Sequence, residues 1–259
     1  MEHGEKEDLS LDVEALRRKL GPAKVSLIEQ WIREVNGPLD AILARYVNAT
    51  SFVLDAGCSR GDPDLPSLQR AKLWIGCDTD ILGLRANRLA HARLHAALQH
   101  LPLKDAAVDV VLCKWVLEHL EVPEKEFREI ARVLRDGGVF VALTPNGYSL
   151  FTAISRTIPY SLKRWLKQWM FGVHEEDTFP TYYRANTVGR LRRLAGKAGL
   201  ERCHLQRLPG MWTFFIFSPL LARLVRRLEH WMSHLPGLQR CNTYLLIVWQ
   251  KPLRSTQKS

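Results

Sequence analysis

Short apolar runs alternate with amphipathic stretches along most of the chain. The amphipathic stretches at 81–95, 124–134, 187–198 and 218–234 carry apolar residues at helical spacing. The apolar runs have the length of buried strands. They cover residues 51–55, 72–78, 108–113, 139–143, 201–208 and 244–249. Because strands alternate with helices, the pattern predicts an α/β fold with a parallel, doubly wound sheet.

Two further regions have helical character near the N-terminus. Residues 9–48 combine helical apolar spacing with charge, and Gly-Pro pairs at 21–22 and 37–38 interrupt them, which predicts two or three covering helices. Between the first two predicted strands, Asp62 and Pro63 are typical of a short helix's N-cap and first residue.

The composition is that of an ordinary globular protein of 259 residues, 46% hydrophobic and 25% charged. The first ten residues are acidic and polar, so they do not predict a secretory signal peptide. The longest strongly apolar stretch, 211–222, is too short to span a bilayer. All five cysteines stand singly, which favours free thiols in a reducing compartment, and we expect a cytoplasmic protein.

Charge is distributed unevenly along the chain. Residues 1–150 carry 19 Lys+Arg and 22 Asp+Glu, a net charge of −3, whereas residues 151–259 carry 18 and 5, a net charge of +13. A one-sided basic half indicates an anionic partner, such as a phosphate-bearing substrate, a membrane surface or nucleic acid. The alternative is a solvated face that only keeps the protein in solution.

A glycine-bearing turn follows the first predicted strand, which ends at Asp55. The turn spans Gly57 to Gly61, and glycines let the backbone approach a ligand where a Cβ would clash. The second strand ends at Asp78, where a carboxylate is placed to accept hydrogen bonds from two ribose hydroxyls. The spacing therefore predicts recognition of a nucleotide-type ligand at the carboxyl ends of parallel strands.

Further motifs follow in a fixed order. They are LPLKD (Leu101–Asp105) with VDVV (Val108–Val111), LEHL (Leu117–Leu120), EIARVL (Glu129–Leu134) with the glycine pair Gly137–Gly138, and TPN (Thr144–Asn146). Together with Asp55-x-Gly57-x-Ser59-x-Gly61 and Asp78, they resemble the class I S-adenosylmethionine-dependent methyltransferases, most closely the type 11 small-molecule branch. The resemblance covers about Val53 to Asn146.

This resemblance implies a Rossmann-like sheet of seven mostly parallel strands, with helices on both faces and an antiparallel last strand. It also implies S-adenosylmethionine as the cofactor and in-line methyl transfer to a small or lipid-like acceptor. No metal is expected, since the sulfonium is already an activated donor. The implied cofactor-binding residues are Asp55, Gly57, Ser59, Gly61, Asp78 and, through its backbone, Lys114.

We expect one structural domain in three parts. Residues 1–50 form an N-terminal helical cover, and residues 51–146 form the S-adenosylmethionine-binding core. Residues 147–259 supply a substrate lid and the C-terminal completion of the sheet.

The chain departs from the family pattern at two positions that bear on cofactor binding. Ser59 stands where glycine is usual, and Ala97 stands where an acid often contacts the adenine amino group. A lost hydrogen bond at Ala97 would cost about 1 kcal/mol of cofactor affinity. A non-catalytic cofactor-binding module of the same fold therefore stays open as an alternative.

The turn also spells G-x-S-x-G with Ser59 at its centre, the nucleophile elbow of serine hydrolases. That elbow normally follows several strands of the sheet, whereas this one follows the first. A dehydrogenase fingerprint would need glycines at 57, 59 and 62, where this chain has Ser59 and Asp62. Both classes are therefore weaker alternatives.

Histidine pairs four residues apart, at 91 and 95 and at 230 and 234, have a spacing that can ligate metal on a helix. No carboxylate or cysteine completes either site in the sequence. Solvent-facing or hydrogen-bonded histidines are the favoured interpretation.

His119 follows the strand at 108–113 and is a candidate general base over the methyl-transfer position. Alternatively, it is a helix-start residue that packs against the sheet. The segment Phe179–Asn186 resembles a substrate-side region in part of the family. Candidates for the substrate wall, or for loop packing, are Tyr148, Tyr182, Tyr183, Arg184 and Asn186.

Residues 211–228 form an apolar-basic stretch within the positive half of the chain. It predicts peripheral contact with the inner face of a membrane, or a clasp around a lipid-like substrate. The alternative is a lid helix packed on the sheet with its arginines outward. A nucleic-acid partner is not expected, because no recognised binding motif interleaves these arginines.

Overall fold

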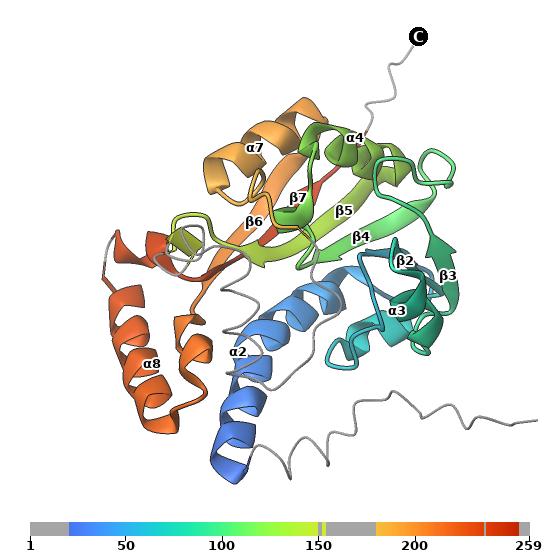
Figure 1. The fold of residues 1–259 in the computed structure, drawn as a ribbon. Coiled ribbons are helices and arrows are strands. Elements are labelled where there is room, and N and C mark those ends of the chain that lie inside the picture. Colours follow the sequence, from blue (N-terminus) through green and yellow to red (C-terminus); the bar gives the residue numbers. More distant parts are fainter. Residues whose placement is uncertain (1–20, 150–151, 154–179, 236, 254–259) are drawn as a thin grey trace, which may run out of the picture.

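The computed structural model describes residues 21–149, 152–153, 180–235 and 237–253. Within them, one sheet has the strand order β3-β2-β1-β4-β5-β7-β6 (Figure 1). Its strands are β1 (Phe52–Ala56), β2 (Leu73–Asp78), β3 (Ala92–His95), β4 (Val108–Lys114), β5 (Leu134–Pro145), β6 (Glu201–Leu208) and β7 (Tyr244–Gln250). Strands β1 to β5 pair in parallel, and β7 runs antiparallel to both β5 and β6. The predicted fold class, with its antiparallel last strand, is confirmed.

Helices cover both faces of this sheet, which makes three layers. Val53 and Val141 face the layer that contains α2 (Pro22–Tyr46) and the 3-10 helix η1 (Pro66–Arg70). Their neighbours Leu54 and Phe140 face α4 (Pro123–Val133) and α7 (Val188–Lys197) on the other side. Because successive strand residues point to opposite faces, continuous apolar runs are what a sheet buried on both faces requires.

Helix α2 is a single helix of 25 residues that runs through Gly37 and Pro38. The prediction of separate helices is therefore wrong within residues 22–46, and residues 9–20 lie outside the described part. A proline inside a helix removes one backbone hydrogen bond. Val35 and Leu39 flank Pro38 and are fully buried against the sheet layer, so tertiary packing outweighs the local break signal.

The helix predicted over residues 81–95 is wrong in its second half. Helix α3 spans Ile81–Ala86, and Asp80 caps it by accepting hydrogen bonds from the backbone N–H groups of Leu82 and Gly83. The chain then turns at Asn87 and forms the short edge strand β3. The short helix expected from Pro63 also differs, because η1 begins only at Pro66.

Between β6 and β7 the chain leaves the sheet and forms η3 (Met211–Phe215), α8 (Pro219–Ser233) and η4 (Leu238–Cys241). The helix predicted over 218–234 is thus present as α8, and it lies beside α2 rather than on the sheet (Figure 1). Trp212, Ala222 and Leu27 form a small core at this contact. In the described segments, no helix is long and apolar enough to cross a membrane.

Candidate functional site

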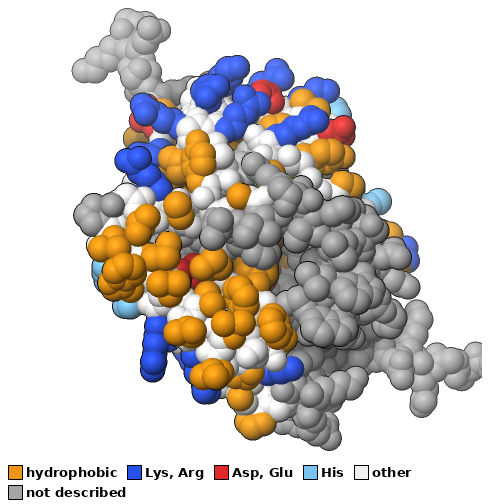
Figure 2. Space-filling view, turned by 60° about the vertical axis from the view of Figure 1, so that its left-hand side comes forward, with side chains coloured by type: hydrophobic (Ala, Val, Ile, Leu, Met, Phe, Trp, Pro, Cys, Tyr) orange, Lys and Arg blue, Asp and Glu red, His pale blue; other side chains and the backbone are white. Residues whose placement is uncertain are grey.

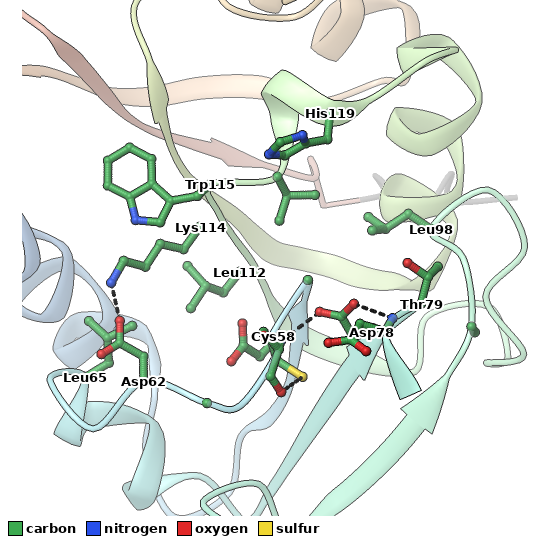
Figure 3. A pocket seen from close by; sticks show the side chains of 17 residues that line it. Cys58, Asp62, Leu65, Asp78, Thr79, Leu98, Leu112, Lys114, Trp115 and His119 are labelled. Carbon is green, nitrogen blue, oxygen red and sulfur yellow. Dashed lines mark hydrogen bonds and ion pairs between the residues drawn. The ribbon is translucent and has the colours of Figure 1, made fainter. Parts of the chain in front are cut away.

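A cavity of about 420 Å³ opens at the carboxyl edge of the sheet, where β1, β2 and β4 end (Figure 3). All six residues that the sequence predicted for cofactor binding line this cavity, and His119 lines it too. They are Asp55, Gly57, Ser59, Gly61, Asp78 and Lys114. Parallel strands that end at one edge thus bring together side chains that lie up to 59 residues apart in the sequence.

The turn after β1 needs glycine at two positions. Gly57 has a φ of +79°, and a Cβ there would lie 2.2 Å from the Cγ2 of Val116. Gly61 has a φ of +85°, and its Cβ would lie 2.8 Å from the side-chain oxygen of Asn87. These glycines are therefore required first by the protein's own backbone and packing.

Ser59 adopts the left-handed conformation with a φ of +42°, although it is not a glycine. Its backbone N–H donates to Asp78 Oδ2 at 2.7 Å, and the N–H of Asp80 donates to Asp78 Oδ1 at 2.9 Å. The half-buried Asp78 carboxylate therefore braces the turn while lining the cavity. Each of its oxygens keeps a second lone pair with which it can accept a ligand hydroxyl.

Asp55 is buried at the end of β1, below the turn. Burial raises the pKa of its carboxyl to about 7, and the neighbouring Asp62 adds to the rise. The group is therefore poised between its neutral and charged forms near neutral pH.

Lys114, at the end of β4, reaches across the cavity and forms an ion pair with Asp62 (Figure 3). Asp62 also lines the cavity, although the sequence around it indicates only a helix cap. The two partners are 52 residues apart, so nothing local in the sequence signals the pair.

The cavity also has an apolar wall that the sequence did not reveal. Ala96 and Leu98 follow β3, and Leu112 and Val116 belong to the β4 end. Ala97 lies exposed between two of these lining residues and offers no polar side chain. The departure from the family pattern at this position is thus next to the cavity wall.

His119 ends η2 (Leu117–His119), and its ring lies over the cavity (Figure 3). Its Nδ1 is 2.9 Å from the backbone carbonyl oxygen of Pro180. Because a carbonyl can only accept, we assign the ring proton to Nδ1, which leaves Nε2 as the basic nitrogen of the neutral ring.

The predicted substrate segment folds onto η2 without entering the cavity wall. The N–H groups of Tyr182 and Tyr183 donate to the carbonyl oxygen of Glu118 at 2.8 and 3.1 Å. Arg184 donates to the carbonyl of Glu121 and lies over the ring of Tyr182. These three candidates therefore lie beside His119. The exposed Tyr148 follows the end of β5, where its backbone N–H donates to Asn146 Oδ1.

The fifth candidate, Asn186, is buried in a polar network. Its Nδ2 donates to Thr144 Oγ1 at 2.7 Å, and Thr144 in turn donates to Glu118 Oε2 at 3.1 Å. Burial raises the pKa of Glu118 to about 7. This arrangement ties the substrate segment to the end of β5, which favours a packing role for Asn186.

Of the two histidine pairs, only His230 and His234 lie on one helix as the metal-binding spacing requires. His91 Nδ1 accepts from the backbone N–H of Trp74, and His95 lies on β3 beside the carbonyl of Thr79. His230 and His234 do face each other on α8, with Nε2 atoms 3.2 Å apart. Among the described residues, no group of three or more metal-ligating side chains occurs.

Comparison with known proteins agrees with this geometry. Residues 54–142 match the family described as a methyltransferase domain. A probable S-adenosylmethionine-dependent methyltransferase of Mycolicibacterium smegmatis is 41% identical over 97 residues, which are 36% of this chain and 38% of that protein. The match thus spans less than two fifths of the length of that curated relative.

Two solved structures share the fold at low sequence identity. The putative methyltransferase of Haloferax volcanii, in complex with the Trm112 methyltransferase activator, has a TM-score of 0.56 and 18% identity over 92% of this chain and 97% of that one. The geranyl diphosphate C-methyltransferase of Streptomyces coelicolor has a TM-score of 0.51 and 15% identity over 83% and 76%. Residues 54–142 thus match a methyltransferase domain and are similar to part of S-adenosylmethionine-dependent methyltransferases, in agreement with the resemblance that the motifs implied.

Proposed function

We propose that this protein transfers a methyl group from S-adenosylmethionine to a small or lipid-like acceptor. The observation that carries the proposal is that all six expected cofactor residues, from three strand ends, line one cavity. The matched family segment includes the G-x-S-x-G turn, so the turn is better explained as a cofactor loop than as a hydrolase elbow. The geranyl diphosphate methyltransferase shares the fold, which is consistent with a small-molecule acceptor.

The residues present suit this cofactor. The Asp78 carboxylate would accept hydrogen bonds from the ribose hydroxyls, and Ala96 and Leu98 would offer an apolar wall to the adenine ring. The turn from Gly57 to Gly61 would bring its backbone close to the ligand, and Lys114 would contact it through its backbone. When bound, the cofactor supplies a methyl group already activated on a sulfonium.

The protein's own contribution is then position and, for some acceptors, a base. Holding the acceptor and the methyl group in line lowers the activation free energy by several kcal/mol. An acceptor that must lose a proton would need a base over the cavity, and Nε2 of His119 is the basic nitrogen placed there.

Calorimetric titration with S-adenosylmethionine and S-adenosylhomocysteine tests the cofactor. We expect micromolar binding, and we expect Asp78→Ala to weaken it by about 100-fold, because two hydrogen bonds to a charged acceptor are lost at roughly 1.5 kcal/mol each or more. Asp105→Ala, an exposed acid outside the cavity, is the matched control. Equal binding by wild type and Asp78→Ala would contradict the site.

A second measurement separates the enzyme from a non-catalytic module. Ser59 and Ala97 motivate that alternative, because both depart from the family's cofactor pattern. Incubation with cofactor and cell extract should release S-adenosylhomocysteine in proportion to a methylated product. Tight cofactor binding with no such release would support the module instead.

A further inference from the structure

One face of α8 exposes a row of large apolar side chains. Leu220, Leu224 and Leu228 are four residues apart and Trp231 follows three later, so at 3.6 residues per turn they share one face. They are 79%, 62%, 48% and 58% exposed, and Phe217 just before the helix is exposed as well. Figure 2 shows hydrophobic side chains gathered on this side of the molecule, with basic side chains at their margin. We call these five residues the α8 stripe.

The opposite face of α8 attaches the helix to the rest of the protein. Ala222 and Val225 pack with Trp212 and Leu27, and Arg226 pairs with Glu34 of α2 at 2.8 Å. Within the described residues, the helix is thus held without using the α8 stripe. An amphipathic surface helix normally buries its apolar side, so the exposed row calls for an occupant.

Charge on α8 indicates what the occupant is. Arg223 and Arg227 are exposed beside the stripe. Glu229, the one acid on this helix, is buried and accepts hydrogen bonds from the backbone N–H groups of Gly210 and Met211. We propose that the α8 stripe inserts into the interface of an anionic lipid membrane, with Arg223 and Arg227 at the level of the headgroups.

A second copy of this chain fits the stripe less well. Two α8 helices packed on each other would bring exposed arginines together, and α8 carries no exposed carboxylate to neutralise them. A lipid surface with negative headgroups satisfies both the apolar row and the arginines.

The position of α8 connects this surface to the cavity. The segment from η3 to η4 is inserted between β6 and β7 at the carboxyl edge of β6, and β6 runs in the same direction as β1 to β5. Trp115, in the cavity wall, packs edge-on against Tyr244 with ring centroids 4.9 Å apart, and Tyr244 packs against Gly210 next to η3. A membrane bound to α8 would therefore lie at the same edge of the sheet as the cavity, the edge where the parallel strands end. Resting on the proposed function, this makes a membrane-resident lipid or lipid-linked molecule the acceptor class.

Sedimentation with vesicles tests the proposal on the full chain. Wild-type protein should bind vesicles of phosphatidylglycerol and phosphatidylcholine at least tenfold more tightly than vesicles of phosphatidylcholine alone. Leu220→Glu with Leu224→Glu, and separately Arg223→Glu with Arg227→Glu, should each reduce binding at least tenfold. Arg226 is left unchanged because it pairs with Glu34.

Matched controls carry the same chemical change elsewhere. Leu82→Glu alters an equally exposed leucine on α3, and Arg192→Glu with Arg193→Glu reverses the same charge on α7. Both controls should bind vesicles like wild type. Wild-type binding that ignores anionic lipid, or stripe variants that bind normally, would overturn the proposal.

Two other measurements would show that something other than a membrane covers the α8 stripe. A dimer in light scattering that Leu220→Glu with Leu224→Glu dissociates, without vesicle binding, would assign the face to a second copy. A lowered unfolding temperature of that variant, again without vesicle binding, would assign it to another part of this chain. Both results overturn the proposal. Calorimetric titration with S-adenosylmethionine, in the absence of vesicles, tests the cofactor site separately, so failure of one proposal is distinguishable from failure of the other.

Discussion

At the scale of single residues, Gly57 shows how the turn after β1 depends on the absence of a side chain. An alanine there would be strained at a φ of +79° and would also collide with Val116. We expect Gly57→Ala to lower the free energy of unfolding by about 3 kcal/mol, because it combines left-handed strain with a steric clash. Urea unfolding followed by circular dichroism measures this change.

Two comparisons separate the causes of that loss. Gly199 has a φ of +76°, and a Cβ added there would meet no atom within 4 Å, so Gly199→Ala should cost only the strain, about 1 kcal/mol. In a double-mutant cycle, Val116→Ala should relieve part of the Gly57→Ala clash, with a coupling of about 1 kcal/mol. Additive effects would show that Val116 is not the obstacle.

The glycines and end-of-strand acids that the sequence predicts for cofactor binding all line the cavity. Their roles follow from local backbone requirements that a short motif records, as at Gly57 and Asp78. The Lys114–Asp62 pair and the wall at Leu98 were not predicted, because they arise only when separate strands end side by side.

At the scale of elements, η3 and α8 are joined to the end of β6 by one buried carboxylate. Glu229 accepts from the N–H of Gly210 at 2.8 Å, from the N–H of Met211 at 3.0 Å and from Thr243 Oγ1 at 2.9 Å. Glu229→Ala should lower the free energy of unfolding by about 3 kcal/mol or more, since several buried donors lose their acceptor.

The matched variants for this prediction lie on the same helix. Glu229→Gln keeps the volume and one acceptor oxygen, so we expect an intermediate loss. Arg223→Ala, at an exposed position, should change the free energy of unfolding by less than about 0.5 kcal/mol. Thermal unfolding of the three variants ranks them, and a wild-type midpoint for Glu229→Ala would contradict the proposed brace.

Element boundaries were predictable where burial and local signals agree. The apolar runs of β1, β2 and β4 are buried on both faces, and each was identified from sequence. In α2, the Gly-Pro signal conflicted with core packing, and packing prevailed. The sequence did not predict β3, because its four residues alternate between half-buried and exposed positions and carry little apolar signal.

At the scale of the whole molecule, the two carboxyl groups buried near the carboxyl edge link stability to pH. Burial raises the pKa of Asp55 and that of Glu118 to about 7. In the native state each group holds its proton over a pH range in which the unfolded chain has already lost it. Their contribution to stability is therefore complete below the unfolded pKa and is lost as pH rises toward 7.

Glu118→Gln isolates one of these groups, because glutamine keeps an oxygen that can accept from Thr144 Oγ1 but carries no proton to lose. Glu118 has a pKa of about 7 against an ordinary value of 4.5, so we expect the variant to be more stable than wild type by about 2 to 3 kcal/mol at pH 8. At pH 4.5 most of that difference should vanish. Urea unfolding at half-unit pH intervals measures this difference in stability.

Glu121→Gln, at an exposed neighbouring position, should differ from wild type by less than about 0.5 kcal/mol at both ends of the range. A Glu118→Gln difference that stays constant with pH would mean that the pKa of this carboxyl is not raised in the native protein, so that the network through Thr144 holds a charge at neutral pH.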